Sequence, residues 1–116
     1  MAAHALQISP PTPLEQIATT LCLTRTELAR LFGVRRQALD QWEARGLPSA
    51  RQQKLATLGA IADLLAAKLK HDRIPGVVRR PTPAYGGRSL LDAVSDGDEE
   101  LVYDALRDAF DWSTTA

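Results

Sequence analysis

The feature that most constrains the fold is the stretch RTELARLFGVRRQALDQWEARG, residues 25–46, in which two apolar-periodic segments meet at one glycine. Ala29 stands four positions before Gly33, and Leu39 and Trp42 follow six and nine positions after it. In a helix-turn-helix a small residue lets the second helix cross closely, and glycine accepts the turn. Apolar residues of the second helix then face the core. The spacing therefore predicts two helices joined by a tight turn, although any helical hairpin shares part of this pattern.

The second of these helices would direct a polar face outward, and we predict DNA contacts from that face and from the start of the first helix. Arginine can read guanine and glutamine can read adenine, but a pair of arginines at a helix start can equally contact phosphates. Asp40 can accept a hydrogen bond from cytosine or brace Arg36, and bracing is the interpretation favoured here. The predicted DNA-binding residues are Arg25, Arg35, Arg36, Gln37, Asp40 and Gln41.

The rest of the chain also predicts helices, so the expected fold class is all-α. TPLE at 12–15 and TRTE at 24–27 are capping boxes that open the first two helices. Ser49 is the expected cap of a long helix that reaches about Lys70, and Ser89 is the expected cap of a short one. The proline- and glycine-containing stretch 74–87 is expected to be loop or extended chain, with Val77-Val78 as the one possible strand. The last helix would bury Leu101, Val102, Ala105, Leu106 and Ala109.

The long central helix carries more apolar positions than a single buried stripe requires, which indicates burial on two sides. A second copy of the chain or the C-terminal part of the same chain could cover the second side. We favour a dimer here, because single helix-turn-helix modules gain specificity from two half-sites about 34–36 Å apart. A substitution at Leu64 can distinguish a dimer from coverage by the C-terminal part of the same chain.

Charge divides the chain into a basic front and an acidic end. Residues 25–54 hold seven basic and three acidic side chains, and residues 55–91 hold six and two. Residues 92–116 hold one basic and eight acidic side chains. Because an acidic segment repels phosphate, the two parts suggest different partners, unless the acidic end only solvates a surface helix.

Several classes of protein are disfavoured by composition. No run of about 18 apolar residues is present, so no membrane span is expected. Residues 1–11 lack the features of a secretion signal and are predicted to be a flexible arm. The single cysteine, Cys22, fits a reducing cytoplasm, and His4 and His71 lack ligand spacing. No catalytic constellation is visible, so neither a metal, a cofactor nor an enzyme activity is expected.

Two parts of the sequence resemble known families. Residues 25–46, including Trp42-Glu43, resemble the Xre/Cro-type helix-turn-helix family. Residues 79–110 resemble the C-terminal domain of Xre-type antitoxins that partner RES-domain toxins (the Xre/MbcA/ParS group). That domain has a proline-containing lead, an aromatic or leucine before paired glycines, and a short helix that begins with serine or threonine, then proline or leucine, then leucine. A glycine-bearing turn and a final helix follow. In this chain the matching segments are 81–83, 85–87, 89–92, 96–97 and 101–110.

The resemblance implies an antitoxin of a type II toxin–antitoxin system that represses its own operon. Such a toxin breaks down NAD, and the C-terminal region of the antitoxin covers the entrance to the active site. The implied division is a DNA-binding domain over 12–73 and a toxin-binding domain over 74–116. The predicted toxin-binding residues are Arg79, Arg80, Tyr85, Gly86, Gly87, Arg107, Asp111 and Trp112.

Carboxylates and an aromatic ring suit a dinucleotide cleft, with its cationic contacts and apolar wall. We therefore expect Trp112 at an interface, whereas Phe110 is expected in the core. A stand-alone repressor whose C-terminal half only dimerises is the main alternative. An enzyme with its site at residues 85–88 ranks last, because no base or nucleophile is present there.

Overall fold

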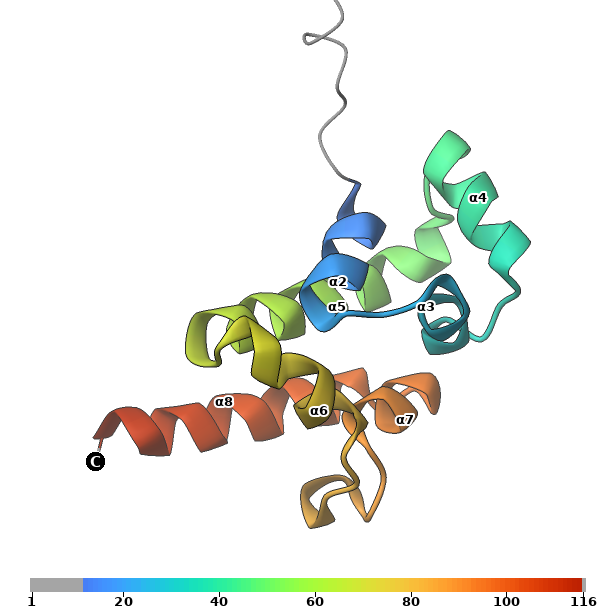
Figure 1. The fold of residues 1–116 in the computed structure, drawn as a ribbon. Coiled ribbons are helices and arrows are strands. Elements are labelled where there is room, and N and C mark those ends of the chain that lie inside the picture. Colours follow the sequence, from blue (N-terminus) through green and yellow to red (C-terminus); the bar gives the residue numbers. More distant parts are fainter. Residues whose placement is uncertain (1–11, 116) are drawn as a thin grey trace, which may run out of the picture.

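The computed structural model describes the backbone of residues 12–115 and the side chains of residues 12–111. Within this range the chain is helical and contains no strand, which confirms the all-α prediction (Figure 1). The predicted arm over residues 1–11 and the predicted interface role of the Trp112 side chain lie outside the described residues. The elements are α2 (Pro13–Leu21), α3 (Arg25–Leu31), α4 (Arg36–Arg45), α5 (Ser49–Lys68), η1 (His71–Arg73), α6 (Ile74–Arg79), η2 (Pro83–Tyr85), α7 (Leu90–Ser95) and α8 (Glu99–Thr115).

Both predicted capping boxes are present. The Thr12 hydroxyl accepts a hydrogen bond from the Glu15 amide at 3.2 Å, and the Thr24 hydroxyl accepts one from the Glu27 amide at 3.1 Å. In each case the glutamate side chain accepts from the threonine amide in return, so free amides at the helix start are satisfied. Ser89 also caps α7 as predicted, with its hydroxyl 3.1 Å from the Asp92 amide.

Two sequence-based expectations about the helices are wrong. Residues 74–79 form α6 instead of loop or strand, because Pro75 lies in the first turn, where a missing amide donor costs nothing. Ile74 and Val78 lie one turn apart on this helix, and both are buried. Ser49 does not cap α5 through its side chain; the cap position is Pro48, and the helix ends at Lys68.

The central helix α5 is covered on two sides by its own chain. It packs against α2 on one side and along α8 on the other (Figure 1). Leu58, Ile61 and Leu65 are fully buried, and Leu64 is partly buried against the same core. The breadth of the apolar arc is therefore explained by packing within one chain, and it gives no evidence for the dimer favoured from the sequence.

The last helix turns a narrower face to the core than the sequence predicts. Val102 is 0% and Leu106 8% exposed, and Ala105 and Phe110 are partly buried against the core. Leu101 is 48% exposed, contrary to the prediction, and Ala109 is exposed as well. Leu101 precedes Val102 by one position, which places it about 100° around the helix and away from α5.

Polar contacts join the two halves of the chain across the predicted boundary between residues 73 and 74. Thr57 Oγ1 on α5 donates to Glu100 Oε1 on α8 at 3.0 Å, and Lys54 Nζ donates to the Val94 carbonyl at 2.8 Å. Arg79 Nη2 on α6 lies 2.8 Å from Glu27 Oε1 on α3. The buried side chains also form one cluster that extends through both halves, so the helix-turn-helix and the C-terminal helices share a core.

Candidate nucleic-acid interface and the C-terminal surface

The inner side of α4 is fixed against α3 and the start of α5. Gly33 has the left-handed φ of +66° that the turn requires, and the Val34 amide donates to the Ala29 carbonyl at 3.1 Å. Leu39 is 0% exposed, and the rings of Phe32 and Trp42 meet edge to face with centroids 5.4 Å apart. These contacts set the angle between the two helices, as the predicted helix-turn-helix requires.

Arg51, on α5, strengthens the packing of α4 against α3. Its Nη1 donates to the Phe32 carbonyl at 2.8 Å, and its guanidinium carbon lies 5.7 Å from the centroid of the Trp42 ring. A cation over an indole face is attracted by the negative ring face. Arg51 therefore acts as an internal brace, although it belongs to the basic front of the chain.

The outward face of α4 carries the polar residues expected from the sequence. Arg35, Arg36, Gln37, Asp40 and Gln41 are all exposed. The side chains of Arg35 and Arg36 form no ion pair or hydrogen bond with any other described residue. In Figure 1, α4 stands at the edge of the molecule, so this face is open to a large ligand.

Arg25, predicted to contact DNA, is held by two carboxylates of α4. Its Nη2 lies 2.7 Å from Asp40 Oδ1 and 2.6 Å from Glu43 Oε1, which ties the start of α3 to the middle of α4. The hydrogen bond to Glu43 contributes most to raising the pKa of Arg25 above its ordinary value. The expected bracing of Arg36 by Asp40 is wrong, because Asp40 pairs with Arg25 instead. The Asp40 side chain nevertheless stays 73% exposed on the outward face.

A cleft of about 760 Å³ lies in the elbow between α3 and α4. Arg35, Arg36, Gln37 and Asp40 line it from the α4 side. Thr26 and Arg30 line it from α3, and the sequence reasoning did not assign them. Their spacing of four residues on a short helix could have indicated a shared outer face. The outward face of α4 thus continues onto α3.

The predicted toxin-binding residues differ in their exposure and contacts. Arg79 serves the fold, since its Nη2 also donates to the Cys22 carbonyl at 2.7 Å, and Tyr85 is only 6% exposed. Burial raises the pKa of the Tyr85 phenol. Arg80 is exposed, and Arg107 is exposed with its guanidinium 5.7 Å from the Tyr103 ring. Gly86, Gly87 and Asp111 are also exposed.

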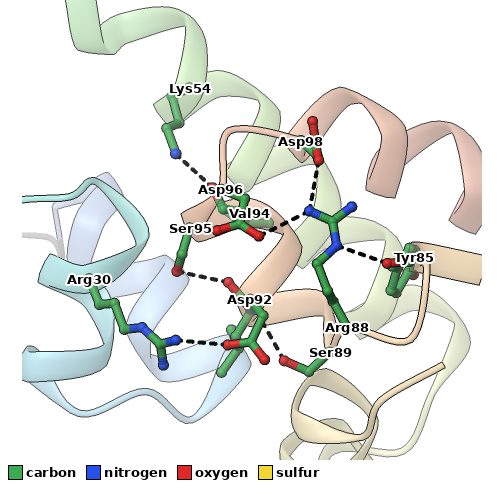
Figure 2. Close-up of polar contacts among 11 residues, drawn as sticks. Arg30, Lys54, Tyr85, Arg88, Ser89, Asp92, Val94, Ser95, Asp96 and Asp98 are labelled. Atoms are coloured by element: carbon green, nitrogen blue, oxygen red, sulfur yellow. Dashed lines mark hydrogen bonds and ion pairs between the residues drawn. The ribbon is translucent and has the colours of Figure 1, made fainter.

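Arg88 is the C-terminal residue whose role the sequence reasoning missed. Figure 2 shows its guanidinium between two carboxylates, with Nη1 2.8 Å from Asp98 Oδ2 and 3.1 Å from Asp96 Oδ2. Its Nε donates to the Tyr85 carbonyl at 2.9 Å. The hydrogen bonds to Asp98 and then Asp96 raise the pKa of Arg88. Arg88 therefore holds the two-glycine turn against the α7–α8 turn. The acidic residues that begin eight positions after Arg88 in the sequence could have indicated this role.

The five acidic residues from Asp92 to Glu100 each have a polar partner within the chain. Asp92 pairs with Arg30, Asp96 and Asp98 pair with Arg88, Glu99 lies 3.4 Å from Lys54 Nζ, and Glu100 accepts from Thr57. Three further acidic side chains of α8 are exposed, those of Asp104, Asp108 and Asp111. Their spacing of four and three residues places them along one side of the helix.

The described residues show no metal or membrane feature. No group of three or more histidine, cysteine, aspartate or glutamate side chains in this part of the chain could hold a metal ion. Cys22 Sγ lies 4.0 Å from His71 Nε2, and these two side chains alone do not form a metal site. Between residues 12 and 115 no helix is both long and apolar enough to cross a bilayer.

Comparison with known proteins yields no match to a family model, to a curated protein or to a solved structure.

Proposed function

We propose that the protein binds operator DNA through the elbow of α3 and α4 and represses its own operon. The observation that carries this proposal is the outward face of α4. Arg35 and Arg36 are exposed there, and their side chains have no ion-pair or hydrogen-bond partner among the described residues, while the inner side of the same helix is held by Leu39 and Trp42. A positioned helix with exposed guanidinium groups suits a DNA major groove about 12 Å wide.

The individual side chains on this face suggest different tasks. Arg35 and Arg36, at the start of α4, suit phosphate contacts or guanine, and Gln37 and Gln41 suit adenine. Asp40 is held by Arg25, so its carboxylate is oriented and partly neutralised while it remains exposed. An acceptor in this position suits the amino group of cytosine.

We further propose that the C-terminal half neutralises a RES-domain toxin that degrades NAD, as the resemblance of residues 79–110 implies. The exposed aspartates of α8 support this, because carboxylates can occupy a cleft built for the phosphates of a dinucleotide. In Figure 1, α4 lies at the upper right and α8 in the lower part, with α3 and α5 between them. The two partners would therefore use separate surfaces of one chain.

A matched pair of variants tests DNA binding. Arg35→Ala/Arg36→Ala removes two charges from the outward face of α4. Lys70→Ala/Arg73→Ala removes two exposed charges at the opposite end of α5. Binding to the DNA upstream of the gene is measured by fluorescence anisotropy at fixed salt. We expect the α4 variant to lose about tenfold or more in affinity, at about 1–3 kcal/mol for each specific contact, and the control to lose far less. Equal losses of DNA affinity in the two variants would show that Arg35 and Arg36 contribute no more to binding than the control residues.

Co-expression tests the antitoxin role. A RES-domain protein encoded beside this gene should stop growth when expressed alone, and growth should return when this chain is expressed with it. If the neighbour is harmless, or if growth is not restored, the chain is better described as a stand-alone repressor.

A further inference from the structure

An apolar groove of about 290 Å³ lies between α8 and the segment formed by α6 and η2. Its apolar walls include Val77, Ala84, Tyr85, Ala105, Leu106 and Ala109. Arg80 is the one charged residue among the described residues that line it. The Arg80 side chain is exposed and forms no ion pair or hydrogen bond with another described residue. The groove therefore suits a bulky apolar side chain that arrives together with a negative charge.

The neighbouring face of α8 has the complementary character. Leu101, Asp104 and Asp108 are spaced by three and four residues, so they share one side of the helix, and all three are exposed. Leu101 is 48% exposed and is the one exposed large hydrophobic residue among the described side chains. The two carboxylates form no ion pair or hydrogen bond with another described residue. This face therefore offers a bulky apolar side chain next to two negative charges.

The groove and the exposed face lie side by side along the same helix. Asp104 directly precedes Ala105 of the groove, so the two side chains are about 100° apart around the helix axis. When two parallel helices pair about a two-fold axis, opposite flanks of the two helices meet, as the flanking charges of a parallel coiled coil do. A two-fold axis along α8 would thus set the Leu101 face of each copy against the groove of the other.

We propose that the protein forms a dimer in which the groove of each copy receives the partner's Leu101, while Arg80 pairs with the partner's Asp104 or the partner's Asp108. Charge selects this occupant, because one chain supplies both the cation and the carboxylates that the contact needs. The inference does not depend on the proposed antitoxin function. A toxin that used the same aspartates would compete with the second copy for this surface.

This arrangement suits the contact with DNA proposed for α4. In Figure 1, α4 lies toward the side of the molecule at which α8 begins, and the C-terminal end of α8 lies on the opposite side. Rotation about an axis along α8 leaves this order unchanged, so both α4 helices would stand at the same end of the pair. Two copies of α4 at one end can contact two half-sites of one duplex.

The test is sedimentation equilibrium of the full chain and of two charge-reversal variants. Arg80→Glu reverses the cation of the groove, and Asp104→Lys/Asp108→Lys reverses the carboxylates of the opposing face. Asp63→Lys/Asp72→Lys is the control, since it reverses two exposed charges that lie outside both the groove and α8. Circular dichroism melts at concentrations below the dissociation constant of the dimer establish that each chain is folded.

We expect the wild type and the control to dimerise. Each charge-reversal variant should have a dissociation constant raised about tenfold or more, because like charges then meet at the contact. An equimolar mixture of the two variants should dimerise again, since every charge pair in the mixed dimer is of opposite sign. The recovery should weaken at high salt, which screens these pairs.

Three outcomes would overturn the proposal. The first is a monomeric wild type, and the second is a dimer that charge reversal weakens no more than the control does. The third is a mixture of the two folded variants that binds no more tightly than either variant alone, because Arg80 would then have a different partner from these carboxylates.

Discussion

Arg30 on α3 and Asp92 on α7 are 62 positions apart in the sequence, yet Arg30 Nη2 lies 2.9 Å from Asp92 Oδ1 (Figure 2). Arg30 lines the same cleft as Arg35 and Arg36 on the proposed DNA-binding face. Asp92 belongs to the C-terminal half. The acidic half therefore neutralises a cation beside the proposed DNA-binding face directly.

Replacement of Asp92 by asparagine should release Arg30 for phosphate contact. We expect Asp92→Asn to bind non-specific DNA more tightly at low salt and to make the salt dependence of binding steeper, by up to about 0.9 in the slope of log K against log salt. The two proteins should converge as salt screens the contact. Fluorescence anisotropy with a random duplex at several salt concentrations measures both quantities.

Asp63→Asn is the matched control for this prediction, because it removes an exposed carboxylate from α5 that forms no ion pair with a described residue. It should change the slope less than Asp92→Asn does. Equal effects of the two variants would show that net charge, and not the release of Arg30, sets the change.

Glu27 should make stability depend on pH. Burial of Glu27 works against the charged form, but hydrogen bonds from Arg79 and Thr24 outweigh it and lower the pKa of Glu27. A carboxyl group with a lowered pKa stabilises the fold above its unfolded pKa and loses that contribution as pH falls through the folded pKa. Glu27→Gln should therefore cost about 0.5–1 kcal/mol at pH 7, in line with partly exposed ion pairs. The cost should decline below about pH 4.

Urea unfolding of both proteins from pH 7 to pH 3 measures this difference. In an Arg79→Gln background the cost of Glu27→Gln at pH 7 should be smaller, because the main partner is absent. A cost that is independent of pH would mean that the ion pair does not stabilise the fold.

The two halves should unfold together because α5 and α8 share a core. Val102→Ala, at a fully buried position of α8, should lower the free energy of unfolding by about 1–3 kcal/mol. Leu101→Ala, at an exposed position of the same helix, should change it by less than about 0.5 kcal/mol. The decrease in the free energy of unfolding caused by Val102→Ala should be the same whether unfolding is followed by helix content or by Trp42 fluorescence. The fluorescence measurement uses a Trp112→Phe background. A Trp42 transition unaffected by Val102→Ala would show two independent domains.

Local signals in the sequence predicted much of the fold. The two capping boxes, the turn at Gly33 and the inward Leu39 depend on short-range rules, and the structure confirms all of them. The exposure of the polar face of α4 followed from the same periodicity. The prediction of a loop over residues 74–79 is wrong because proline disrupts a helix interior but is well tolerated in the first turn.

Partners that are distant in the sequence could not be predicted. Nothing near Asp40 indicates that it pairs with Arg25, and nothing near Asp92 indicates Arg30, because these pairs depend on how the helices pack. The long apolar arc of α5 predicted burial on two sides but not which surface would cover it. The packing of α8 on α5 also means that removal of the residues after Val94 would expose core, so point variants separate the two proposed functions more cleanly.

The position of α8 has a consequence for the newly made chain. The ribosome releases α2 to α5 before α8, so the side of α5 that α8 covers stays open while the rest is being translated. Until α8 emerges, the nascent helix-turn-helix lacks part of its core and is exposed to chaperones and proteases. The half proposed to bind DNA would therefore mature only when the acidic helix is also made, so that neither proposed activity would be present in the cell without the other.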